Sequence, residues 1–197
     1  MEEKDKKEVR RKAGRKARRK GSSFELNCCK LLTAWWFPDD DFTGVNATKL
    51  PFFRSPGSGG WATKRKHQND NRINEMSGDI ICPSDFPFSI EMKNQEEWDF
   101  DQYFKENPGF KLWGWWKQTT EQAERANKKP LLLFTKNHSP VYYAMYEPNI
   151  IANFNLRTTL LWTPDWYKTI KFYVGLLSNF AGKVSKVELL KLYETAS

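Results

Sequence analysis

The sequence predicts an α/β protein in which helices flank a central mixed β-sheet. Segments with helical and with extended hydrophobic patterns alternate along the 197 residues, as expected of this class. Hydrophobic residues make up 39% of the chain and aromatic residues 15%, which is enough to form a buried core. No apolar run reaches the roughly 18 residues of a membrane span, and the charged N-terminus is unlike a signal peptide. We therefore expect a soluble, cytoplasmic protein.

The positive charge is concentrated at the N-terminus. Residues 1–20 contain 11 Lys or Arg and 4 Asp or Glu, which accounts for +7 of the formal net charge of +8. A flexible basic arm over residues 1–20 would bind a polyanion, either nucleic acid or an anionic membrane surface, although a solvated terminus could have the same composition. We expect nucleic acid rather than a membrane, with Arg18, Arg19 and Lys20 as DNA-binding candidates.

The first elements of the expected core follow the arm. Apolar residues recur at helical spacing after Ser22, which predicts a helix over 23–36. Residues 51–55 predict a short strand. The polar, glycine-rich segment 56–76 predicts a mobile loop over a site, because loops of this length in compact domains are commonly functional. Its basic residues are further DNA-binding candidates: Lys64, Arg65 and Lys66.

The rest of the chain predicts alternating strands and helices. The hydrophobic patterns and turn residues predict two strands joined by a turn (78–82 and 87–93), a helix (111–127) and a hairpin (131–135 with 141–146). Ser185 and Glu188 have the spacing of a capping box, which predicts a short C-terminal helix. We expect residues 21–146 to form the core unit and residues 147–197 an extension packed on it.

The cysteines indicate neither a disulfide framework nor a zinc site. Cys28 and Cys29 are adjacent, Cys82 is distant, and the two histidines lie far apart in the sequence. Buried free thiols are the simpler interpretation.

Chemistry is indicated by Asp79 and by the sequence Glu91-Met92-Lys93. On a strand, residues 91 and 93 point to one face while Met92 points to the other. If the two predicted strands pair, Asp79 approaches Glu91, and two adjacent carboxylates repel each other unless a cation lies between them. Oxygen ligands favour Mg²⁺ or Mn²⁺, which can clamp a phosphate oxygen and lower the pKa of a bound water. Alternatively, Glu91 and Lys93 form a surface charge pair without a catalytic role.

These motifs, in their order along the chain, resemble the PD-(D/E)XK nuclease superfamily, and within it the archaeal-type Holliday junction resolvases. The resemblance covers about residues 18–146. Its pieces are Lys20 to Glu25, Phe53 to Gly59, Gly78 to Ile81, Ile90 to Lys93, and Trp116 to Gln118 with Lys129 to Leu132. The basic arm, the length between Ser58 and Asp79, and the region beyond residue 147 depart from that pattern; a bacteriophage or archaeal-virus enzyme would be compatible with them.

The resemblance implies a restriction-endonuclease-like core and a role for each matching residue. Asp79, Glu91, Glu25 and the Met92 carbonyl would hold Mg²⁺, with Mn²⁺ as a substitute, and Lys93 would be the catalytic lysine. Ser58 and Gln118 would complete the catalytic set, and Arg54 and Ser55 would contact the DNA backbone. Four of these residues have simpler explanations. Glu25 could cap a helix that begins near Ser22, turn chemistry could account for Arg54 and Ser58, and Gln118 could be solvated on its helix.

The resemblance also implies a homodimer that cuts four-way DNA junctions by paired symmetric nicks, leaving 5′-phosphate and 3′-hydroxyl ends. We expect no small-molecule cofactor. The alternatives are another PD-(D/E)XK nuclease acting on duplex or branched DNA, and a non-catalytic nucleic-acid-binding protein. The tryptophan pairs 35–36 and 115–116 could stack on bases, but their helical positions favour the core or a subunit interface.

Overall fold

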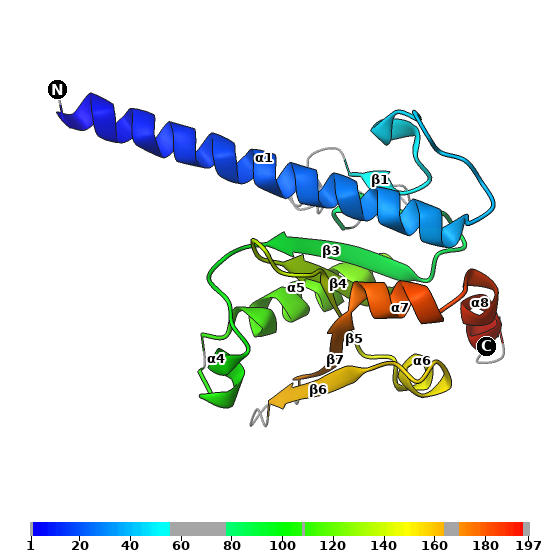
Figure 1. The fold of residues 1–197 in the computed structure, drawn as a ribbon. Helices are drawn as coiled ribbons and strands as arrows, with labels where there is room; N and C mark the ends of the chain where they lie inside the picture. Colours follow the sequence, from blue (N-terminus) through cyan, green and yellow to red (C-terminus); the bar gives the residue numbers. More distant parts are fainter. Residues whose placement is uncertain (1, 56–77, 108, 164–169, 195–197) are drawn as a thin grey trace.

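The computed structural model describes residues 2–55, 78–107, 109–163 and 170–194, and it has the expected α/β architecture (Figure 1). The helices are α1 (Glu2–Trp36), η1 (Ala47–Lys49, a 3₁₀ turn), α4 (Asp101–Phe104), α5 (Lys111–Arg125), α6 (Pro148–Asn153), α7 (Leu177–Lys183) and α8 (Lys186–Glu194). The strands are β1 (Phe53–Arg54), β2 (Ile80–Ile81), β3 (Phe88–Asn94), β4 (Lys129–Thr135), β5 (Tyr142–Met145), β6 (Thr158–Thr163) and β7 (Ile170–Leu176).

Five strands form the central mixed sheet in the order β3-β4-β5-β7-β6. β3 pairs with β4 in parallel, and the other neighbours are antiparallel. The connection from β3 to β4 runs through α4 and α5, because two parallel strands need a crossover between them. The expected mixed sheet flanked by helices is therefore confirmed.

Each face of the sheet has its own hydrophobic core. On one face, alternate residues of β3 and β4 pack with α1, α7 and α8. On the other face, the intervening residues of β4, β5 and β7 pack with α5. Trp36 lies in the first core, while Trp115 and Trp116 lie in the second, all less than 9% exposed. This burial confirms the core interpretation of these three tryptophans.

The expected start of the first helix, at residue 23, was wrong. α1 runs without a break from Glu2 to Trp36, and its N-terminal part projects beyond the sheet (Figure 1). Residues 2–20 are rich in Ala, Glu, Lys and Arg, which favour helix, and Gly14 and Gly21 each cost only about 1 kcal/mol relative to Ala. The basic segment expected to be a flexible arm is thus helical.

Most other expected elements are present. The hairpin is β4 with β5, the helix expected over 111–127 is α5, and the capping box begins α8: the Ser185 hydroxyl accepts from Glu188 N–H at 3.3 Å and donates to its carboxylate. Cys28 and Cys29 are buried and Cys82 is half-buried, all as free thiols. The expected loop 56–76 lies outside the described residues.

Residues 147–197, expected to be an extension packed on the core, supply two strands of the central sheet. β7 pairs with β5 and β6 pairs with β7, so the extension shares the sheet and both cores with the preceding residues. The boundaries of the three proposed segments stay a prediction. Among the described residues, no helix is long and apolar enough to span a membrane.

Candidate active site

Asp79 is placed against the edge strand β3 by the glycine that precedes it. Gly78 has a φ of 109°, and a Cβ built at this position would lie 2.7 Å from the carbonyl oxygen of Ile90. Only glycine adopts this conformation without strain and permits so close an approach. The next residue then donates its backbone N–H to that same Ile90 carbonyl at 3.0 Å.

The strands carrying Asp79 and Glu91 do not pair as neighbours in a sheet, which was the condition under which the sequence brought the two carboxylates together. β2 pairs with β1 in a separate two-stranded sheet, whereas β3 pairs with β4. Asp79 nevertheless reaches β3, because its Oδ2 accepts a hydrogen bond from Met92 N–H at 2.8 Å. Asp79 is thus joined to β3 by two hydrogen bonds, one from its own N–H to the Ile90 carbonyl and one from Met92 N–H to its carboxylate.

Glu91 is buried on the α5 side of β3, where it is 1% exposed. Its Oε1 accepts hydrogen bonds from Lys93 Nζ at 2.5 Å and from Gln118 Nε2 of α5 at 2.8 Å. Its Oε2 is also buried and accepts no hydrogen bond from a donor in the described part of the chain. The charge pair of Glu91 and Lys93 is therefore buried rather than on the surface, and the half-buried Gln118 is bound to Glu91.

Burial raises the pKa of both carboxyl groups. The pKa of Glu91 rises to about 7, first because burial disfavours the carboxylate and second because the Asp79 charge repels it, while Lys93 acts in the opposite direction. Burial also raises the pKa of Asp79, against the hydrogen bond from Met92 N–H and the charge of Lys93. The two carboxylates are therefore poorly compensated by the protein alone.

Glu25 of α1 approaches the same site but is held by Arg54 of β1. Arg54 donates from Nε to Glu25 Oε2 and from Nη1 to the hydroxyl of Ser22 at 2.7 Å. Burial raises the pKa of Glu25; the charges of Asp79 and Lys93 also act on it, in opposite directions. Because α1 begins at Glu2, Glu25 is not in the first turn of a helix, and the capping explanation is excluded.

The donor set suits a hard divalent cation. Asp79 and Glu91 supply adjacent buried carboxylates, and Glu91 Oε2 is an acceptor without a donor among the described residues. In the described residues no group of three His, Cys, Asp or Glu side chains forms a candidate metal site. The third nearby carboxylate, Glu25, is paired with Arg54. Oxygen-only ligands of this kind fit Mg²⁺ or Mn²⁺, which complete their shells with water.

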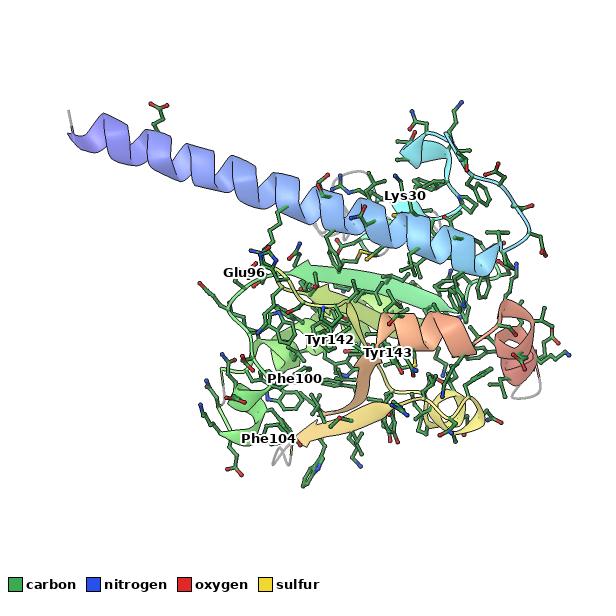
Figure 2. All side chains as sticks on the ribbon, viewed as in Figure 1. Lys30, Glu96, Phe100, Phe104, Tyr142 and Tyr143 are labelled. Atoms are coloured by element: carbon green, nitrogen blue, oxygen red, sulfur yellow. The ribbon has the colours of Figure 1, made fainter. Side chains whose placement is uncertain are left out.

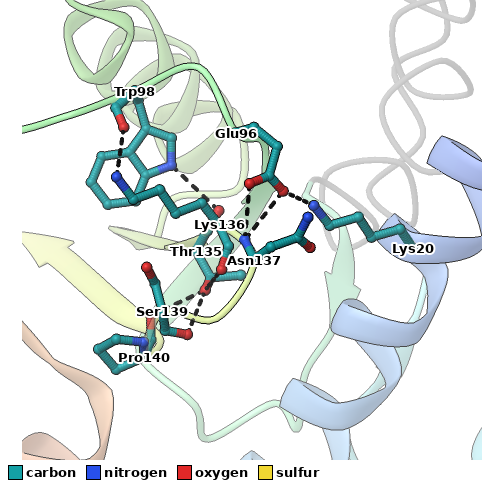
Figure 3. A network of polar contacts seen from close by, with 8 residues as sticks. All are labelled: Lys20, Glu96, Trp98, Thr135, Lys136, Asn137, Ser139 and Pro140. Atoms are coloured by element: carbon teal, nitrogen blue, oxygen red, sulfur yellow. Dashed lines mark hydrogen bonds and ion pairs between the residues drawn. The ribbon is translucent and has the colours of Figure 1, made fainter.

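The predicted DNA-binding residues are only partly placed near this site. Arg54 lies beside it, whereas Ser55 is 7% exposed and its backbone N–H donates to the carbonyl of Asp79. Lys20 pairs with Glu96, which also accepts from Asn137 N–H (Figure 3). The described structure does not include the other candidates, or includes only their helical backbone: Arg18, Arg19, Ser58, Lys64, Arg65 and Lys66.

Two contributors were missed at the level of the sequence. Gln122 lies one helical turn beyond Gln118, and its side chain acts to lower the pKa of the Glu91 carboxyl group. Its spacing of four residues from Gln118 places both amides on one face of α5, a signal that could have been used. Ser22 holds the guanidinium of Arg54, a contact across 32 residues that has no local signature.

Comparison with known proteins supports a nuclease. A family model described as "Phage putative PDDEXK endonuclease" matches residues 16–191, which is most of the chain. Searches of curated proteins and of solved structures found no match. The match spans α1, the site on β3 and the strands β6 and β7, and the fold agrees with the restriction-endonuclease-like fold. The chain therefore belongs to the phage putative PDDEXK endonuclease family, whose description names an endonuclease of the PD-(D/E)XK superfamily.

Proposed function

We propose that the protein is a metal-dependent, structure-selective endodeoxyribonuclease that resolves four-way DNA junctions. The observation that carries the nuclease chemistry is a cluster at the edge of the sheet, in which the buried Asp79 and Glu91 lie with the half-buried Lys93 and Gln118. The preference for junctions rests on the resemblance of the ordered motifs to archaeal-type resolvases. Paired symmetric nicks, a homodimer and action in the cytoplasm of an infected host belong to the same proposal.

Asp79, Glu91 and the Met92 carbonyl would hold Mg²⁺, for which Mn²⁺ could substitute, and Glu25 would join them. A bound divalent cation supplies Lewis acidity to the scissile phosphate and lowers the pKa of a water molecule. Gln118 donates to Oε1 of Glu91, whereas Oε2 accepts no hydrogen bond within the described residues. Oε2 is therefore available as a metal ligand.

Lys93 would stabilise the charge that builds on the phosphate as water attacks. Its ammonium group already donates to Glu91, so it lies beside the carboxylates rather than in solvent. Attack by the water oxygen forms a new P–O bond and breaks the bond to the 3′-oxygen, which takes up a proton. The products then carry 5′-phosphate and 3′-hydroxyl ends.

Arg54 would exchange partners when DNA binds. Its guanidinium is partly exposed and is shared between Glu25 and Ser22 in the free protein. A backbone phosphate can bind a guanidinium in a bidentate manner, so it competes with the Glu25 carboxylate as well as with the Ser22 hydroxyl. We therefore expect DNA to draw Arg54 away from Glu25, which frees the carboxylate for the cation. Ser55, Ser58, the basic end of α1 and Lys64 to Lys66 are proposed to support the DNA.

The test is cleavage of a labelled immobile four-way junction beside a duplex of equal length, with Mg²⁺ or Mn²⁺ and with chelator. Asp79→Asn removes a proposed ligand at nearly constant shape, and Glu121→Gln is the matched control, because Glu121 is exposed on α5. We expect metal-dependent paired nicks in the junction, loss of cleavage in Asp79→Asn with binding retained, and full activity in Glu121→Gln.

Other outcomes separate the alternatives. Cleavage of junction and duplex alike would replace the resolvase with a less selective nuclease of the same superfamily. Tight binding by the wild type without cleavage, with either metal, would favour a non-catalytic DNA-binding protein. An unimpaired Asp79→Asn variant would remove this cluster from the mechanism.

A further inference from the structure

The strand β6 forms one edge of the central sheet, and among the described residues it pairs with β7 only. The strand order places β3, which carries the candidate active site, at one edge and β6 at the other, on the side farthest from α1 (Figure 1). Within the described structure, β6 packs extensively against β7 alone. One row of its backbone N–H and C=O groups thus lacks a strand partner among the described residues, which makes it a template for another strand.

The sequence of β6 lacks the features that usually protect such an edge. Residues 158–163 read Thr-Thr-Leu-Leu-Trp-Thr, without a charge, a proline or a glycine. Leu160 and Trp162 point to the same face and are 41% and 48% exposed, which is unusual for large apolar side chains in a strand. Edge strands of monomeric proteins commonly carry lysine, proline or a bulge to prevent pairing.

Apolar surface continues from β6 onto both neighbouring faces. On the outer face, Leu160 lies opposite Tyr173, whose ring stacks on Tyr146 with centroids 6.1 Å apart and Tyr146 44% exposed. On the other face, residues of β6 and β7 line a cavity of about 440 Å³ together with Phe104, which is 74% exposed beside β6 (Figure 2). Exposed apolar side chains therefore surround this one edge.

We propose that β6 pairs with β6 of a second copy of this chain, antiparallel and across a two-fold axis, to join the two sheets. In an antiparallel pair, the side chains of two residues that lie opposite each other are on the same face of the sheet, and the faces alternate along each strand. Across a two-fold axis, the two opposite residues must therefore both have even numbers or both have odd numbers. Centring the axis on Leu161 satisfies this condition and sets Leu160 opposite Trp162 of the second copy, twice. Aromatic and branched apolar side chains form favourable cross-strand pairs, so this register covers the two exposed large apolar side chains of β6.

Charge and position favour a second copy over nucleic acid. β6 carries no cation; among the described residues, Arg157 precedes it and Lys171 lies opposite Trp162 on β7. Most of the excess positive charge lies at the start of α1. Pairing through β6 leaves both copies of β3 at the outer edges of a ten-stranded sheet, where DNA can reach them. The proposal specifies the interface of the homodimer proposed above and is independent of the cleavage chemistry.

The test is the mass of the full-length protein in solution, measured by light scattering and sedimentation over a wide concentration range. Leu160→Lys and Trp162→Lys place a charge on the edge while their side chains stay solvent-exposed. Val187→Lys is the matched control, because Val187 is 62% exposed on α8, away from the sheet edge. We expect a dimer for the wild type and the control, and half that mass for both edge variants, with unchanged circular dichroism.

A wild type that stays monomeric at every concentration would overturn the proposal, and so would a dimer that persists in both edge variants. The second result would place the dimer interface elsewhere. A monomer whose DNA binding is lost in Trp162→Lys would instead assign the aromatic surface to nucleic acid. If the variants fail to fold, hydrogen exchange of the wild type decides: protection of the amides of β6 must rise with protein concentration. Asp79→Asn should keep the dimer mass, so a failed interface and a failed nuclease mechanism are distinguishable.

Discussion

The buried carboxyl groups of Asp79 and Glu91 lie side by side, an arrangement expected to be more stable with a bound cation than without one. Backbone and side-chain donors satisfy one oxygen of each, yet burial still raises both pKa values. A structural ion pair would not leave a buried carboxylate oxygen without a donor, because an unsatisfied polar group costs free energy. At the scale of single residues, this arrangement is the basis of the proposed cation site.

This arrangement predicts a stability that falls with rising pH in the metal-free protein. The pKa of Glu91 is about 7 in the folded chain, above the ordinary 4.5. A raised pKa in the folded state contributes stability that is complete below the unfolded value and is lost as pH rises through the folded value. We expect the Tm of the wild type to fall as the pH rises from 4.5 to about 7, and the Tm of Glu91→Gln to stay constant over the same pH range. Above it, Mg²⁺ should restore the wild-type Tm; equal pH profiles by calorimetry would contradict the role of Glu91.

The contact between Arg54 and Glu25 predicts that the arginine weakens metal binding in the absence of DNA. Arg54→Gln should free Glu25 and tighten Mg²⁺ binding about 5-fold or more, a coupling of ordinary size. The same substitution should weaken DNA binding. Titration calorimetry on the protein alone measures the first effect, with Lys111→Gln as the control, since Lys111 pairs with the exposed Glu97. Unchanged Mg²⁺ affinity in Arg54→Gln would show that Glu25 is not a ligand.

At the scale of elements, Gly78 decides whether the segment carrying Asp79 can close on β3. An alanine there would adopt an unfavourable φ and bring its Cβ within 2.7 Å of the Ile90 carbonyl. We expect Gly78→Ala to destabilise the fold by ~1–3 kcal/mol in urea unfolding and to impair cleavage. Gly114→Ala is the control, because its Cβ would meet nothing within 4 Å in α5 and should stabilise the helix by up to ~1 kcal/mol. Equal effects of the two substitutions would refute the steric argument.

The helix α1 joins the basic segment to the site, because Glu25 and most of the Lys and Arg excess lie on one continuous element. Removing residues 1–19 should weaken DNA binding and flatten its salt dependence, by about 0.9 in the log–log slope per lost phosphate contact. Gly14→Pro interrupts the helix but keeps every charge, so its slope should stay close to that of the wild type. Fluorescence anisotropy at several salt concentrations measures both. A truncated protein with the full slope would remove this segment from the DNA interface.

At the scale of the whole molecule, the sheet unites the parts of the chain that the sequence separated. β7 pairs with β5 in the sheet, and its Phe172 and Val174 belong to the hydrophobic core that packs against α5. A chain that ends at residue 146 therefore lacks part of this core. We expect a protein ending at residue 146 to lose cooperative unfolding and to bind a hydrophobic dye, as partly folded states do. A sharp thermal transition for this fragment would show that residues 21–146 form an independent unit.

Local patterns were sufficient for several elements and for the central residues of the site. The two-residue period of a strand places Glu91 and Lys93 on one face, and helical spacing identifies α5 with Gln118. The same patterns placed the start of α1 at residue 23, because Gly21 resembles a break while the favourable residues around it maintain the helix. β6 and β7 went unrecognised, since short apolar runs near the C-terminus do not by themselves distinguish strand from helix.

The sequence by itself determined the fold class, the basic N-terminal segment and the side chains able to carry out phosphate chemistry, because these follow from residue type and local period. Only the tertiary structure decided three contacts of the site. The Asp79 carboxylate accepts a hydrogen bond from Met92 N–H, Gln118 donates to Glu91, and Arg54 donates to Glu25. The tertiary structure also decided which strand is left at the open edge of the sheet. The physical reason is the same in each case: these contacts join residues far apart in the chain, and hydrogen bonding and packing between distant segments leave no periodic trace in the sequence.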